Sequence, residues 1–211
     1  MYMGINKKPR INDYWSSSWF EGTSPIKDLM TRERFYTVLR SLMFTRERKI
    51  PGSGDRLYRI RNLINMLNTT YAQNYYPHEA ISVDESLVKY KGVMTKMKVK
   101  MDKKAARVGF KQYKLNCAES SYCVRAETYS NSLCDDWKTF QLSNYDLRSF
   151  TDPAKVVLFL IKPYLGYGHT VGLDQWFSEP RLFRILLEEQ TNCIGTMQDR
   201  RNMPKTAYKN R

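Results

Sequence analysis

The chain has 211 residues, of which 42% are hydrophobic and 13% aromatic, so it can bury a core, and these values exclude a wholly disordered protein. The 35 Lys and Arg residues outnumber the 21 Asp and Glu residues and give a formal net charge of +14. The longest wholly apolar run, at positions 156–161, has six residues, whereas a membrane-spanning helix needs roughly 20. The first residues contain no apolar signal-peptide stretch. We therefore expect a soluble protein with no membrane contact.

The positive charge is concentrated in two segments. Between positions 89 and 114, ten basic side chains accompany a single acid, Asp102, and five further basic residues lie between positions 200 and 211. Local basic segments on an otherwise neutral chain indicate a polyanionic partner better than a diffusely basic surface does. The candidate binding residues of the first segment are Lys89, Lys91, Lys96, Lys98, Lys100, Lys103, Lys104, Arg107, Lys111 and Lys114.

Two helices are predicted in the first third of the chain, over residues 24–45 and 55–76. Ser24 suits the N-cap of the first helix and Pro25 its first helical position. Apolar residues recur at helical spacing in both segments, and a Pro-Gly-Ser-Gly sequence separates them. Residues 1–77 are therefore expected to form a small helical N-terminal unit.

From residue 80 the hydrophobic pattern changes to a period of two, which is typical of strands. Strands are expected over residues 81–88, 96–101, 108–118 and 122–129, the last two joined by a short turn as an antiparallel pair. In the second of these segments lysines alternate with apolar residues, so that strand would present a lysine face.

Helices and strands alternate in the last third of the chain. Asp152 and Pro153 open a helix as its N-cap and first residue, and a second helix is predicted over residues 180–190. Strands are expected over residues 169–176 and 191–197. Antiparallel strands followed by this alternation predict an α/β fold, a mixed sheet with flanking helices, over residues 78–198, followed by a basic tail at 199–211.

The four cysteines and two histidines do not form a recognisable metal site. No Cys-x-x-Cys pair is present, and the histidines lie far apart in the sequence. A structural zinc site needs four Cys or His ligands, commonly in close pairs, so we expect no zinc. The cysteines are expected to be buried, reduced thiols.

Two segments share a local design that places an aspartate after an apolar-x-apolar pair. They are Ile81-Ser82-Val83-Asp84 and Val171-Gly172-Leu173-Asp174. In a strand the apolar residues face the core and the aspartate faces the other way, so on neighbouring strands Asp84 and Asp174 would converge at one rim of the sheet. Paired carboxylates of this kind can hold Mg²⁺ and support attack on a phosphodiester. The alternative is that each aspartate only satisfies amides of the loop that follows its strand.

These segments resemble the piggyBac transposases and the cellular proteins derived from them. The similarity runs from about residue 3 to residue 205, and the order and spacing of its motifs are specific together. The matching pieces are Met3-Gly4, Pro9, Asp13-Tyr14-Trp15, Phe35, Leu39-Arg40, Phe44, residues 81–86 (ISVDES), Lys91-Gly92, residues 103–111 (KKAARVGFK), residues 174–178 (DQWFS), Leu182-Phe183 and residues 193–196 (CIGT).

The resemblance implies an RNase H-like core of the DDE type that uses Mg²⁺ and cuts and joins DNA at TTAA sites. Asp84 matches the first catalytic, metal-binding aspartate of the family and Asp174 the second. The chain ends before the position of the third aspartate, so the resemblance implies an incomplete core. The helical unit matches part of the family's dimerisation and DNA-binding region.

The expected function is therefore double-stranded DNA binding in the nucleus by a transposase-derived protein that lacks catalysis because the third aspartate is missing. Two alternatives stay open. The chain is a fragment of an active Mg²⁺-dependent transposase, or it is an interaction module whose N-terminal helices form a homodimer.

Overall fold

The computed structural model describes residues 2–18, 24–45, 54–90, 96–101, 108–132, 135–142 and 144–197. The chain forms two compact units, Met1–Arg46 and Glu47–Arg211. Within the described residues, no helix is both long and apolar enough to cross a membrane.

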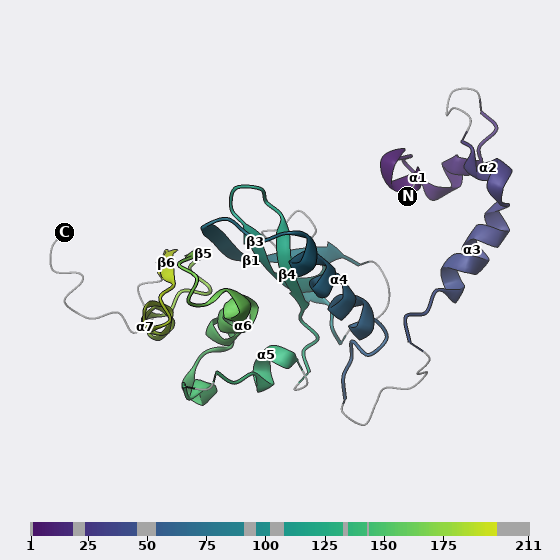
Figure 1. The fold of residues 1–211 in the computed structure, drawn as a ribbon. Coiled ribbons are helices and arrows are strands. Elements are labelled where there is room, and N and C mark those ends of the chain that lie inside the picture. Colours follow the sequence, from purple (N-terminus) through teal and green to yellow (C-terminus); the bar gives the residue numbers. More distant parts are fainter. Residues whose placement is uncertain are drawn as a thin grey trace. The chain divides into compact units, whose positions relative to one another are not determined.

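The first unit consists of short helices (Figure 1): α1 (Tyr2–Ile5), the 3₁₀ helix η1 (Ile11–Trp15), α2 (Ile26–Leu29) and α3 (Arg32–Ser41). The single helix predicted over residues 24–45 is wrong, because Met30 is extended and ends α2. Thr31 then begins a new helix, its hydroxyl accepting the backbone N–H of Arg34 at 3.2 Å. A threonine that satisfies an N-terminal amide in this way is an effective N-cap.

A six-stranded mixed sheet forms the centre of the second unit. Its strands are β1 (Ala80–Lys89), β2 (Val99–Lys100), β3 (Val108–Cys117), β4 (Cys123–Thr128), β5 (Thr170–Leu173) and β6 (Asn192–Gly195). The order is β2-β3-β1-β5-β6, with β4 also paired to β3. Strands β1, β2 and β4 run antiparallel to β3, whereas β5 is parallel to both β1 and β6. The predicted α/β fold with a mixed sheet is confirmed.

The strand predicted over residues 96–101 is largely wrong. Only Val99 and Lys100 pair with β3, while Lys96 and Met97 lie in a turn and Met97 is buried. The alternation of lysines with apolar residues therefore reflects burial of single side chains and not a long lysine-faced strand.

Two helices, α6 (Asp152–Ile161) and α7 (Pro180–Glu188), pack into the core of the sheet. Six of the ten residues of α6 are buried, in agreement with the prediction of a helix covered on most sides. Its N-cap is Thr151, one residue earlier than expected. The shorter helices α5 (Asp136–Thr139), η2 (Leu147–Ser149) and η3 (Lys162–Tyr164) complete this layer.

Helix α4 (Arg61–Asn74) packs against β4 and belongs to the second unit. The Asn68 side chain bonds both the N–H and the C=O of Ala126, and Arg61 lies 3.1 Å from the buried Glu127 carboxylate. The boundary between the two units therefore falls between Arg46 and Glu47 and not at residue 77, because α4 covers the outer edge of a strand that lies far away in the sequence.

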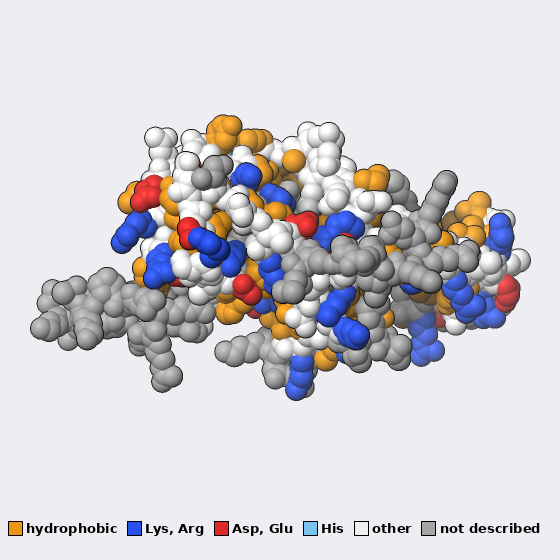
Figure 2. All heavy atoms as spheres, turned by 90° about the horizontal axis from the view of Figure 1, so that it is seen from below, with side chains coloured by type: hydrophobic (Ala, Val, Ile, Leu, Met, Phe, Trp, Pro, Cys, Tyr) orange, Lys and Arg blue, Asp and Glu red, His pale blue; other side chains and the backbone are white. Residues whose placement is uncertain are grey.

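Three cysteines are free thiols in the described part of the chain. Cys117 is buried, and Cys123 and Cys193 are partly buried; Cys134 and the basic tail at 199–211 lie outside the described residues. Figure 2 shows more basic than acidic side chains on the face that it draws, consistent with the net charge of +14.

Candidate functional site

Asp84 and Asp174 lie beside each other at the ends of neighbouring strand segments. In the parallel pair β1–β5, Val83 is opposite Leu173, and each aspartate is the next residue in its chain. Adjacent strands are about 4.8 Å apart, so the register alone brings the two backbones close. The structure therefore brings together the two residues that the sequence pattern pairs.

The two aspartates lie on the side of the sheet opposite the core. Val83 and Leu173 are only 2% and 6% exposed, whereas Asp84 and Asp174 are exposed. Alternation along β1 and β3 puts other polar side chains on the same side as Asp84, which we call the polar face. Its residues are Ser82, Asp84 and Ser86 of β1 and Gln112, Lys114 and Asn116 of β3.

Lys114 is the basic residue directly opposite Asp84 in the antiparallel pair β1–β3. Side chains at directly opposite positions share a face and have Cβ atoms roughly 5 Å apart. The polar face thus places a cationic group next to the aspartate pair, where it would attract a phosphate group of a bound polymer.

Hydrogen bonds from the following turn orient the Asp174 carboxylate. Its Oδ1 accepts the backbone N–H groups of Trp176, at 2.7 Å, and Phe177, at 3.4 Å. Ser178 Oγ donates to the Asp174 carbonyl oxygen at 2.9 Å. The Asp84 Oδ1 accepts its neighbour's N–H, that of Glu85, at 2.6 Å. Asp174 therefore does satisfy amides of the loop that follows its strand, whereas the amide that Asp84 accepts belongs to Glu85 within β1.

The donor set fits Mg²⁺ in one of its common binding modes. Mg²⁺ prefers carboxylate oxygens and is often held by one or two carboxylates together with water and substrate phosphates. Two exposed carboxylates, each directly after one residue of the pair Val83–Leu173, meet that requirement. The described residues contain no group of three or more His, Cys, Asp or Glu side chains that could hold a metal ion by themselves.

The other predicted binding residues are distributed over several places. Lys89 is exposed at the end of β1, and Lys96, Lys98 and Lys100 lie exposed or partly exposed around β2. Lys91, Lys103, Lys104 and Arg107 lie outside the described residues.

Lys111 does not belong with the surface lysines among which the sequence analysis placed it. Its Nζ lies 2.9 Å from Glu85 Oε2, and both side chains are mostly covered, at 14% and 16% exposure. The same Nζ lies 3.9 Å from the ring centroid of Trp176. Lys111 thus faces the core side of β3, away from Lys114, and its charge is used within the fold.

Glu85 and Trp176 are structurally important residues that the sequence analysis did not single out as a pair with Lys111. The alternation of side chains along β3 could have indicated that Lys111 faces the core, because Lys111 shares its face with the buried Tyr113 and Leu115. No sequence pattern, however, connects that face to a turn more than sixty residues later.

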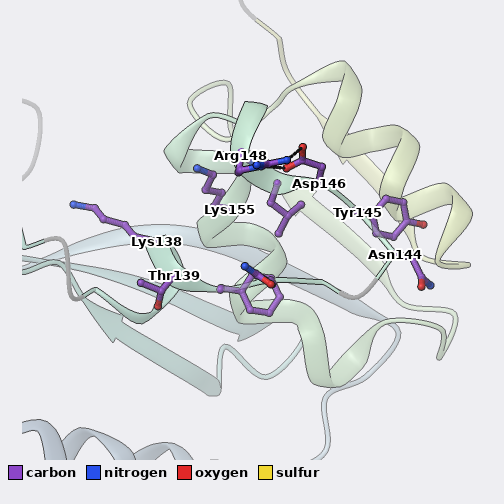
Figure 3. Close-up of a pocket in the computed structure, with 10 residues that line it drawn as sticks. Lys138, Thr139, Asn144, Tyr145, Asp146, Arg148 and Lys155 are labelled. Carbon is purple, nitrogen blue, oxygen red and sulfur yellow. Dashed lines mark hydrogen bonds and ion pairs between the residues drawn. The ribbon is translucent and has the colours of Figure 1, made fainter.

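A cavity of about 730 Å³ lies on the helix side of the sheet, between α5, η2 and α6 (Figure 3). Its basic side chains include Arg148, which is paired with Asp146 at 2.9 Å, and Lys138, which donates to the carbonyl oxygen of Ser132 at 2.9 Å. Lys155 of α6 also lines it. The cavity does not include the aspartate pair.

A family model described as Transposase IS4 matches residues 1–211, the whole chain. The chain belongs to this transposase family. It is also similar in structure to the piggyBac transposase in a cryo-EM structure of a synaptic complex with hairpin DNA, with a TM-score of 0.77 and 20% identity. The match covers 97% of this chain and 41% of that chain, so the chain spans less than half of the solved protein. These findings confirm the resemblance and the fold.

Proposed function

We propose that this chain is a DNA-binding part of a piggyBac-type transposase, with an RNase H-like core in which Asp84 and Asp174 bind Mg²⁺. The strand order supports that core: β4, β3 and β1 form an antiparallel series, and β5 and β6 continue parallel to β1. When bound, Mg²⁺ would activate a water or hydroxyl for attack on a phosphodiester. A protein that acts on chromosomal DNA would work in the nucleus.

The observation that carries the proposal is the position of Lys114 opposite Asp84 on the polar face. A duplex whose phosphate reaches the aspartate pair would bring its charge next to this lysine. Lysines that neutralise phosphates release condensed counterions, so the logarithm of affinity falls with the logarithm of salt by roughly 0.9 per phosphate.

The test is a salt series of DNA binding by the full chain, measured by fluorescence anisotropy with a labelled duplex. Lys114→Ala should reduce the slope by about one unit. Lys155→Ala removes the same charge from α6, on the core side of the sheet, and should leave the slope unchanged. An identical slope for Lys114→Ala and wild type would refute phosphate contact at this face. The triple change of Lys96, Lys98 and Lys100 to Ala should reduce the slope by about two to three units.

We also propose that the 211-residue chain does not cut DNA by itself. Two-metal phosphoryl transfer needs a complete set of metal ligands, and the described residues bring two carboxylates to the polar face. A nicking assay with Mg²⁺ and a transposon-end duplex should give no product. Robust cleavage that disappears in Asp84→Asn and Asp174→Asn would instead establish the alternative, an active transposase fragment.

A second candidate function is homodimerisation through the first unit. Helix α3 has no buried residue. Its side chains Val38 and Leu39 are 42% and 45% exposed, and Leu42, the residue that ends it, is 57% exposed. Sedimentation of the full chain should show a dimer that Leu39→Glu dissociates and Arg34→Glu does not. A monomer in the wild type would exclude this function.

A further inference from the structure

Three side chains from distant parts of the second unit meet next to the aspartate pair. Lys111 of β3 lies between the Glu85 carboxylate, at 2.9 Å, and the Trp176 ring, at 3.9 Å from its centroid. Glu85 directly follows Asp84, and Trp176 lies two residues after Asp174. We call Glu85, Lys111 and Trp176 the lysine clamp. It connects the segments that carry the two aspartates through a strand that carries neither.

The Trp176 ring is held on more than one side. It lies nearly parallel to the Tyr113 ring, with centroids 5.9 Å apart and an interplanar angle of 10°, and it meets the Phe177 ring edge-on at 4.8 Å. The Lys111 ammonium covers it from 3.9 Å. A cation over an indole face is attracted more strongly when water is excluded, and the Lys111 side chain is only 14% exposed.

The ring position is connected to the Asp174 carboxylate by a backbone hydrogen bond. The N–H of Trp176 donates to Asp174 Oδ1 at 2.7 Å, the shorter of the two amide bonds to that oxygen. The strand register places the Asp174 backbone beside Asp84, but it does not determine the direction of the carboxylate. That direction depends on the turn whose Trp176 the clamp holds.

We propose that Lys111 is a positioning residue that orients Asp174 for a divalent cation shared with Asp84, by holding Trp176 against the sheet. The inference rests on the metal site of the proposed function. Lys111 acts through Trp176 and does not touch the cation. Residues that orient a metal ligand from outside typically change affinity by 10- to 100-fold when they are replaced.

The direction in which cation affinity changes when Lys111 loses its charge distinguishes two possible roles of this residue. If the lysine acted only as a nearby positive charge, its removal would strengthen cation binding. If it positions Asp174, its removal weakens binding. Lys114 supplies the matched control, because it also carries a positive charge beside Asp84 but lies on the opposite face of β3.

The experiment measures binding of Tb³⁺ to the full chain by tryptophan-sensitised luminescence, with Mg²⁺ as competitor, and of Mn²⁺ by electron paramagnetic resonance. Affinities are taken from the midpoints of the titration curves, so a change in luminescence amplitude does not bias them. Lys111→Met should weaken both affinities about tenfold. Lys111→Arg, which keeps the positive charge, should retain the wild-type affinities, and Lys114→Met should strengthen them. Unchanged or tighter binding in Lys111→Met would overturn the proposal.

A second measurement separates the clamp from the metal site. Hydrogen exchange of the Trp176 amide should accelerate in Lys111→Met and not in Lys114→Met; equal exchange in wild type and Lys111→Met would refute the clamp. The double variant Glu85→Gln with Lys111→Met removes the ion pair without leaving a buried carboxylate, and it should show the same exchange and affinity changes if folding is intact. Metal binding that is absent, or unaffected by Asp84→Asn and Asp174→Asn, would overturn the metal site and with it the role assigned to Lys111, whatever the exchange data show.

Discussion

Replacement of Asn68 tests whether α4 is part of the sheet unit. The Asn68 Nδ2 donates to the carbonyl oxygen of Ala126 at 2.9 Å, and the N–H of Ala126 donates to Asn68 Oδ1 at 2.9 Å. In the described part of the chain β4 pairs only with β3, so the asparagine takes the place of a further strand at the outer edge of β4. Asn68→Ala removes both hydrogen bonds at once.

The expected loss of stability is about 1.5 kcal/mol. Each hydrogen bond contributes about 1 kcal/mol net, because the groups bond to water in the unfolded chain. Alanine recovers roughly 0.6 kcal/mol, since its helix propensity is better than that of asparagine. Asn65, exposed on the same helix, makes the control: Asn65→Ala retains the propensity gain without losing these bonds.

The measurement is urea unfolding of the full chain, followed by tryptophan fluorescence, together with hydrogen exchange of the Ala126 amide. Trp137 and Trp176 both lie in the second unit, so they report its unfolding. Asn68→Ala should lower the free energy of unfolding and expose the Ala126 amide to exchange, whereas Asn65→Ala should do neither. The assignment of α4 to the sheet unit would be refuted if the two variants behaved alike.

Two further predictions concern the sheet. In Gly109→Ala the added Cβ would lie 2.1 Å from the carbonyl oxygen of Val88, a backbone atom of the paired strand, so we expect a loss of about 2 kcal/mol in thermal unfolding; Gly4→Ala, with nothing within 4 Å, should be neutral. Burial raises the pKa of Glu127 from 4.5 to about 7, against the opposing effect of Arg61. The unfolded chain therefore loses this proton at lower pH than the folded chain does. As the pH rises from about 4.5 to 7, the free energy of unfolding should fall by up to about 3 kcal/mol. Urea unfolding at several pH values should show this fall in the wild type and not in Glu127→Gln.

Local patterns were sufficient to predict most of the strands and the core helices. Strands β3 and β4 and helix α7 lie within the predicted segments, β1 extends one residue beyond its segment at each end, and α6 begins one residue early. Period two and helical spacing are properties of neighbouring residues, so they can be read from the sequence. The predictions failed where a single polar side chain competes with the periodic pattern. Thr31 interrupts an apolar helical stripe by acting as an N-cap, and no apolar periodicity reports such a hydrogen bond.

The boundary of the helical unit could not be predicted for a different reason. Amphipathic spacing shows that a helix has a face to bury, but not what covers it. Helix α4 is covered by β4, whose Ala126 lies 58 residues further along the chain. That contact exists only once the sheet has formed, so the sequence placed α4 with its neighbours in the chain.

The amino-acid sequence by itself determined that Asp84 and Asp174 each follow a buried apolar residue and turn away from the core, since alternation along a strand is local. Only the tertiary structure decided that these strands are neighbours and in which register they pair. Alternation along β3 puts Lys111 and Lys114 on opposite faces, and the register of β3 with β1 decides that Lys114 is opposite Asp84. A shift of one residue in a strand exchanges its two faces, and the contacts that exclude such a shift come from segments far apart in the chain.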